Sequence, residues 1–263
     1  MTNIFDTHAH YSSRQFDADR AALLKALPAG GVVGVLECAT HSGDAAHVLE
    51  LAHSAPYFHA AIGIHPESLI EEDAATVVVY HGDWRAELAA MRPLFEDKSV
   101  VAVGEIGLDH HWPVPRQEQY DLFKAQLQLA KELDLPVSVH DREAHAEMYE
   151  LLRKYKPRGA LHCYSGSADD AAWLVEQGMY LGFGGAVTYK GAKRAAKVLA
   201  AIPHERALLE TDCPYMAPEP VRGTRNDSRN IAHVAAYIGT IWDMDAQAVL
   251  DQTAQNAKAC FGV

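Results

Sequence analysis

The chain has 263 residues, which is long for one small domain but within the usual range of a single large α/β domain of about 250 residues. Nearly half of the residues are hydrophobic, and the formal net charge of -12 argues against a surface coated with basic residues for gripping nucleic acid. No apolar run approaches the roughly 20 residues that cross a bilayer.

The four cysteines, at positions 38, 163, 213 and 260, are widely spread and form no C-x-x-C pair. This usage is typical of reduced thiols that pack in the interior, rather than of a disulfide framework. The N-terminal residues show no basic region followed by an apolar stretch, so no secretory signal is visible. We therefore expect a cytoplasmic protein with no membrane partner.

Short apolar runs rich in β-forming residues recur along the chain, and segments with helical periodicity separate them. Eight such runs predict strands: Asn3–Thr7, Gly31–Glu37, Tyr57–Ile64, Ser99–Ile106, Pro136–His140, Gly159–His162, Met179–Phe183 and Arg206–Thr211.

The clearest helical pattern spans Arg116–Leu133, where Phe123, Leu127 and Ala130 share one face. The tail Ser228–Ala259 also predicts helix. A strand followed by a helix eight times, with no linker-like tract, predicts one domain over residues 1–263. The expected fold is an α/β fold of the (β/α)8 TIM-barrel type.

Histidine and carboxylate side chains follow or end several predicted strands. In FDTHAH, residues 5–10, His8 and His10 are two apart on a strand and should point the same way, roughly 6 to 7 Å apart. Four more candidates stand at other predicted strand ends: Glu105, His140, His162 and Asp212. A single histidine is more often a buried structural residue than a ligand, but the C-terminal strand ends of a barrel surround one mouth. Six donors around it indicate a metal site.

The number of donors favours two ions over one. Six protein ligands around a single zinc would leave no open position for water or substrate. Two ions that share a bridging carboxylate avoid this, so we assign His8, His10, Glu105 and Asp212 to one ion, and Glu105, His140 and His162 to the other. Two divalent ions about 3.5 to 4 Å apart can lower the pKa of a water between them, which predicts a hydrolase. Zn²⁺, Mg²⁺ and Mn²⁺ remain possible ions.

Seven stretches resemble the TatD family of metal-dependent hydrolases in the amidohydrolase superfamily. They are FDTHAH, GIHP at 63–66, GEIGLD at 104–109, PVSVHDREA at 136–144, LHCYSG at 161–166, ETDCPY at 210–215 and RGTRN at 222–226. The resemblance implies a TIM barrel with a two-metal site, and for many members a deoxyribonuclease, often a 3′ to 5′ exonuclease on single strands. The family's metal ligands map onto the same six residues. DNA, single-stranded or at 3′ ends, is then the expected partner, with no obligate protein partner.

Four further residues are candidates for catalysis or substrate binding. His65, after the third predicted strand, fits a contact to a substrate phosphate or transition state, or a structural histidine at the rim. Arg142 can face the same side as His140, or pair with an acid such as Glu143. Arg222 and Arg225 follow the eighth strand, where barrels commonly bind phosphate.

Residues 186–229 hold eight Lys or Arg against five acids. This excess is either a basic patch or an ordinary solvated helix face and loop. Asp212 is expected to be both ligand and general base, and Glu105 to act catalytically as the shared ligand.

The sequence departs from the family pattern at positions near these motifs. The departures are Glu67 where a second histidine is common, His110 and His111 where aromatic residues are common, and Asp227 and Ser228 where an acid and a proline are usual. The segment from Glu67 to Asp83 looks longer than the family needs and adds acidic residues. These differences leave the metal ligands intact and leave the substrate open.

Three classes of function remain. The first is phosphodiester hydrolysis on DNA. The second keeps the same site but cleaves a carboxyl ester or amide, in a small molecule or an aminoacyl-tRNA. The third is a non-catalytic metal-binding or interaction protein, and a complete ligand set with open positions argues against it.

Overall fold

The computed structural model describes residues 1–263. Eight parallel strands follow one another in a single sheet in chain order and alternate with helices, which confirms the (β/α)8 TIM-barrel fold class. The strands are β1 Ile4–Ala9, β2 Val32–Cys38, β3 Phe58–Ile62, β4 Val100–Asp109, β5 Val137–Arg142, β6 Gly159–Leu161, β7 Tyr180–Phe183 and β8 Ala207–Leu209. Each overlaps one of the eight predicted runs.

Ten α-helices accompany the strands. They are α1 Arg20–Ala26, α2 Ser42–Ser54, α3 Ala75–Val78, α4 Trp84–Met91, α5 Arg116–Leu133, α6 His145–Tyr155, α7 Ala168–Glu176, α8 Lys193–Ala201, α9 Ile231–Trp242 and α10 Ala246–Phe261. The predicted bounds of α5 are confirmed. The predicted C-terminal helix forms two helices, since α9 ends at Asp243 in the left-handed conformation. None of the helices has the length and hydrophobicity of a membrane span.

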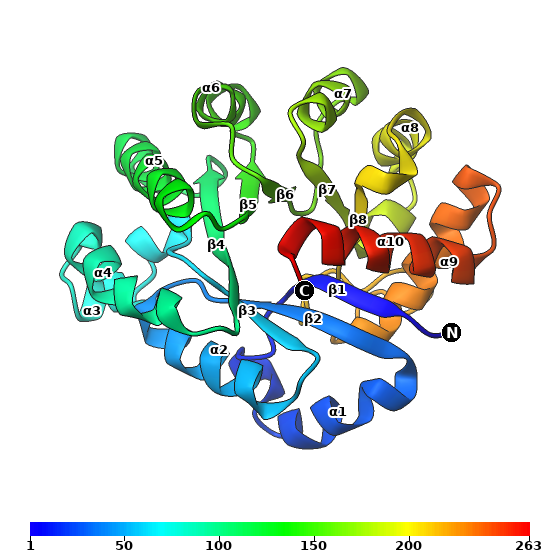
Figure 1. Cartoon of the computed structure of the whole chain (residues 1–263), viewed down its shortest axis with the longest axis horizontal. Helices are drawn as coiled ribbons and strands as arrows, with labels where there is room; N and C mark the ends of the chain where they lie inside the picture. The colour runs from blue at the N-terminus through cyan, green and yellow to red at the C-terminus, as the bar shows by residue number, and fades with distance from the viewer. The chain divides into compact units, whose positions relative to one another are not determined.

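The chain divides into two compact units. Unit 1 comprises Met1–Glu37 and His162–Val263, and unit 2 comprises Cys38–Leu161. Within unit 1, the chain beyond β8 pairs with β1 through a parallel bridge between Ala9 and Cys213. The backbone N–H of Asp212 also donates to the carbonyl of His8, at 2.9 Å. Helices α9 and α10 pack together and against β1 (Figure 1).

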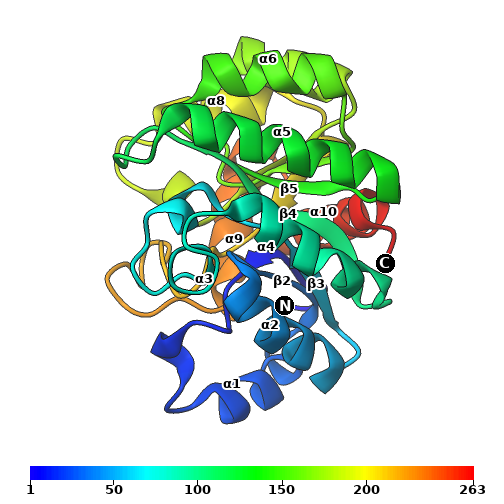
Figure 2. The ribbon, with the colours of Figure 1, turned by 90° about the vertical axis from the view of Figure 1, so that its left-hand side faces the viewer.

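In unit 2, α5 packs against β4 and lies beside α6 (Figure 2). Two buried glutamines on α5, seven residues apart, hydrogen-bond to backbone near the strand ends. Gln126 accepts from the N–H of Ile64 and donates to its carbonyl, at 2.7 and 2.9 Å. Gln119 does the same for Asp109, at 2.8 and 2.7 Å. The backbone next to His65 and at the end of β4 is therefore held by side chains of one helix.

Strands β4 and β5 run further than the sequence predicted. Glu105 and His140 were expected to end their strands, but β4 continues to Asp109 and β5 to Arg142. Gly107 makes this extension possible, because its φ is +152° and a Cβ there would lie 1.9 Å from the carbonyl oxygen of His140. The predicted ends of both strands were therefore wrong.

Candidate metal centre

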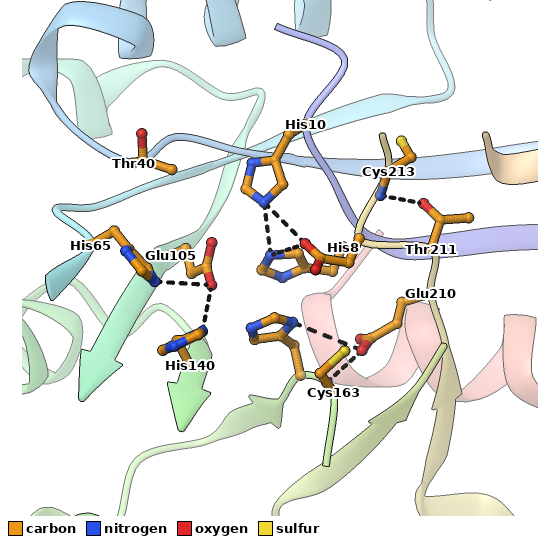
Figure 3. A network of polar contacts seen from close by, with 12 residues as sticks. His8, His10, Thr40, His65, Glu105, His140, Cys163, Glu210, Thr211 and Cys213 are labelled. Atoms are coloured by element: carbon orange, nitrogen blue, oxygen red, sulfur yellow. Dashed lines mark hydrogen bonds and ion pairs between the residues drawn. The ribbon is translucent and has the colours of Figure 1, made fainter. Parts of the chain in front are cut away.

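Unit 1 brings His8, His10 and Asp212 together. The Nε2 atoms of His8 and His10 lie 3.2 Å apart, which confirms that the two side chains point the same way (Figure 3). The Oδ1 atom of Asp212 lies 3.5 Å from Nε2 of His10 and 4.0 Å from Nε2 of His8. His10 and Asp212 are partly exposed, whereas His8 is buried, so the cluster can be reached from solvent on one side.

These three donors fit a divalent ion. In a tetrahedral site with metal–nitrogen bonds of about 2.0 to 2.1 Å, two ligand atoms lie about 3.3 Å apart. The separations of 3.2 and 3.5 Å are close to this value, and the third, 4.0 Å between Asp212 and His8, is longer. Two imidazoles with one carboxylate are donors that Zn²⁺ accepts well and that leave a position open.

The carboxyl group of Asp212 is set up to be ionised. Burial alone would raise its pKa, but the hydrogen bond from His10 and the charges of His162, His10 and His8 lower it below the ordinary value. Its φ of +54° lies in the left-handed region, which aspartate tolerates better than most residues. An ionised Asp212 can bind a cation or accept a proton.

Unit 2 forms a second cluster from His65, Glu105 and His140. Oε1 of Glu105 lies 3.1 Å from Nδ1 of His140 and 3.5 Å from Nε2 of His65, and both rings point at the carboxylate (Figure 3). These separations fit a divalent ion as those in unit 1 do. The structure thus adds His65, expected as a catalytic or substrate contact, to the residues able to bind metal. His162 belongs to unit 1, where its ring stacks on that of His8 at 3.9 Å.

Asp109 orients His140. Its Oδ2 lies 2.9 Å from Nε2 of His140, and its Oδ1 accepts from the backbone N–H groups of His111 and Trp112. Burial would raise the pKa of Asp109, but the hydrogen bond and charge of His140 bring it to about 2. Burial likewise lowers the pKa of His140, but Asp109 and Glu105 outweigh this and raise it to about 10. When metal takes Nδ1, Asp109 can hold the remaining N–H in a carboxylate–histidine–metal arrangement.

Asp6 holds the backbone beside the candidate metal ligands of unit 1. It is fully buried and accepts from the hydroxyls of Thr211 and Ser228, at 2.6 and 2.7 Å, and from the N–H of Thr211. Burial raises its pKa to about 6. The sequence reasoning missed both Asp6 and Asp109, although each stands inside a quoted motif, FDTHAH or GEIGLD.

Glu37, at the end of β2, supports the segment after His10. Its two carboxylate oxygens accept from the backbone N–H groups of Tyr11 and Ser12, at 2.9 and 2.7 Å. Burial outweighs these hydrogen bonds and raises the pKa of Glu37 from 4.5 to about 7. No motif in the sequence pointed to this role, because Glu37 and Tyr11 are 26 positions apart.

We expect the ionisation of Glu37 to destabilise the metal-free protein as pH rises. A carboxyl whose folded pKa is raised contributes stability that is fully present below pH 4.5 and is lost as pH passes about 7. The loss should reach roughly 3 kcal/mol at most. Urea unfolding between pH 5 and 8 measures this. The free energy of unfolding of Glu37→Gln should fall less steeply with pH than that of the wild type.

Glu176→Gln is the matched control, because Glu176 is an exposed acid at the end of α7 in the same unit. Its stability profile should parallel that of the wild type. A Glu37→Gln profile with the wild-type slope would show that Glu37 keeps its ordinary titration.

The three arginines predicted to bind substrate make contacts of their own. Arg225 forms a two-pronged ion pair with Asp19, at 2.8 and 2.6 Å. The guanidinium of Arg222 lies 4.1 Å from the ring centroid of Tyr189. Arg142 is exposed, 6.0 Å from the ring centroid of Trp112. Contact with substrate stays a prediction for all three.

The segment that looked long for the family, Glu67–Asp83, folds as a 3-10 turn from Pro66 to Leu69 followed by α3. Glu67 is half-buried beside the unit 2 cluster. Burial and the charge of Asp109 raise its pKa to about 7. Glu67, one of the acidic residues that this segment adds, therefore lies close to the unit 2 cluster.

Comparison with known proteins identifies the family of this chain. The family model described as "TatD related DNase" matches residues 5–262. The "uncharacterized metal-dependent hydrolase YabD" of Bacillus subtilis is 35% identical over 267 residues, covering 99% of both chains. A protein named "3'-5' ssDNA/RNA exonuclease TatD" from Erwinia amylovora is 32% identical over 272 residues, covering 99% of this chain and 100% of its own.

The crystal structure of YjjV, a TatD homologue from Escherichia coli, superposes on 99% of this chain and 98% of its own with a TM-score of 0.89 at 31% identity. The strand order, the His, Glu and Asp clusters and these full-length matches agree with the resemblance seen in the motifs. The chain belongs to the TatD family of metal-dependent hydrolases.

Proposed function

We propose that the protein is a two-metal nuclease that removes nucleotides from the 3′ ends of single-stranded DNA. The observation that carries the proposal is a pair of clusters able to bind metal in a member of the TatD family. The clusters are His8–His10–Asp212 and His65–Glu105–His140. Relatives about 31 to 32% identical are named 3'-5' ssDNA/RNA exonucleases, which supports this choice of substrate.

Two divalent ions would complete the site. His8, His10 and Asp212 would hold one ion. As predicted from the sequence, Glu105, His140 and His162 would hold the other, and Glu105 would be shared. His65 would be a further donor. Bound together, they would act as Lewis acids and lower the pKa of the attacking water.

The protein's own side chains would supply the remaining chemistry. Asp212 would take the proton of the attacking water at Oδ and pass it to the leaving oxygen. Arg142 would contact a substrate phosphate. Trp112, which lies beside Arg142 and is 46% exposed, would stack on a base. Base stacking and cationic contacts are the two means by which proteins bind single strands without sequence preference.

A substrate comparison tests the proposed function. One metal-replete preparation should shorten single-stranded DNA from the 3′ end, in single-nucleotide steps, faster than it cleaves a panel of carboxyl esters and amides. A 5′-labelled oligonucleotide would show the ladder, and a 3′-blocked one is the control. Turnover of the esters with intact DNA would instead establish the amidohydrolase alternative.

The arginines after β8 give a second test. Arg222→Ala with Arg225→Ala should raise KM for DNA and flatten its salt dependence, while metal content and any turnover of an uncharged ester stay the same. Steady-state kinetics at several salt concentrations measure both quantities.

Because Arg225 also pairs with Asp19, loss of that pair needs its own control. Asp19→Asn removes the pair and keeps the arginine, so KM for DNA should hold or fall. If Asp19→Asn weakens DNA binding as much as the arginine variant does, the role of Arg225 is to order the loop.

A further inference from the structure

Three side chains able to bind a metal ion gather at the Nδ1 edge of His162. The ligand atoms of His162, Cys163 and Glu210 all lie within 4.8 Å of one another, and all three residues belong to unit 1. Nδ1 of His162 lies 3.8 Å from Oε1 of Glu210. Figure 3 shows the side chain of Cys163 directed at the carboxylate of Glu210.

The local backbone holds this arrangement in place. Cys163 has a φ of +46°, and its N–H donates to Oε1 of Glu210. Strand β7 makes room for the carboxylate, because a Cβ on Gly182 would lie 2.2 Å from Oε2 of Glu210. The glycine and the turned backbone at Cys163 therefore bring a carboxylate and a thiol to the same edge of the His162 ring.

The donor set differs from that of the two clusters described above. A thiolate with an imidazole and a carboxylate selects Zn²⁺ over Mg²⁺ or Mn²⁺, because soft sulfur ligands favour thiophilic metals. Glu210 is buried, with 1% of its side chain exposed, and carries a negative charge at the site when ionised. A cavity of about 290 Å³ lies beside the three donors and is lined by Cys163, Gly182, Phe183 and Arg194, among others.

We propose that His162, Cys163 and Glu210 form a separate Zn²⁺ site whose occupation inhibits the enzyme. A neutral imidazole has one nitrogen with a free lone pair and one that carries the proton. Zinc on Nδ1 of His162 fixes the proton on Nε2, so the ring cannot also serve a catalytic ion. This inhibitory consequence rests on the proposed function, but binding at the site does not.

Cobalt spectroscopy tests binding without any activity. Metal-free protein is titrated with Co²⁺, and the near-ultraviolet thiolate-to-cobalt charge-transfer band is recorded alongside the metal count. The wild type should develop the band, and Cys163→Ser should lack it and bind Zn²⁺ at this site at least about tenfold more weakly. Cys260→Ser, which removes a thiol on α10 outside the cluster, should behave as the wild type.

Zinc inhibition tests the consequence. Zn²⁺ added beyond two ions per chain should suppress nuclease turnover of the wild type and of Cys260→Ser, while Cys163→Ser keeps its basal activity and resists. No charge-transfer band in the wild type, or a band that persists in Cys163→Ser, overturns the site. A band with no zinc inhibition overturns the inhibitory role, and a band in a protein without nuclease activity refutes only the proposed function.

Discussion

Glu105→Ala should lower the occupancy of both metal ions and reduce kcat by roughly three orders of magnitude or more. Within unit 2, Oε1 of Glu105 is the atom that both His65 and His140 approach. If the same carboxylate serves two ions, its loss removes a ligand from each and leaves two positive charges without the anion between them. Metal analysis of the replete variant, which should fall well below two ions per chain, measures this.

Asp109→Asn is the matched comparison. It keeps a side chain of nearly the same shape but removes the charge that holds His140. Metal content should then fall toward one ion per chain, because only the ion bound by His140 is weakened. Retention of two ions by Glu105→Ala would eliminate the shared-ligand role and leave Glu105 as an acid at the rim.

The candidate metal ligands could be picked out from the sequence because their signal is local. His8 and His10 are two apart, His8 on β1 and His10 directly after its last residue, and the structure places their Nε2 atoms 3.2 Å apart. Glu105 and His140 lie on strands whose apolar runs are clear in the sequence, and only the predicted ends of these strands were wrong. The alternation of strand and helix was enough for the fold class.

The long-range contacts around the candidate site could not be predicted in the same way. Asp6 reaches Thr211 across 205 positions and Arg225 reaches Asp19 across 206, so no spacing in the sequence links them. Gln119 and Gln126 lie on the buried face of α5, where an amphipathic pattern reads them as interruptions. Their partners are backbone groups, which carry no sequence signal.

Asp212→Asn should lose kcat by roughly 10²- to 10⁴-fold while KM changes little and the metal content stays substantial. The amide has the shape of the carboxylate and one oxygen for the metal, but it cannot accept a proton at neutral pH. Burial works against ionisation of Asp212, yet His10, His162 and His8 together lower its pKa, so the wild-type carboxylate is available as a base.

Asp212→Glu is the companion variant, because it restores the base but displaces it by one methylene, and it should recover part of the turnover. Near-normal kcat in Asp212→Asn would mean that another group takes the proton. An Asp212→Asn protein empty of metal would reduce the role of this residue to that of a ligand, because lost turnover would then follow from lost metal.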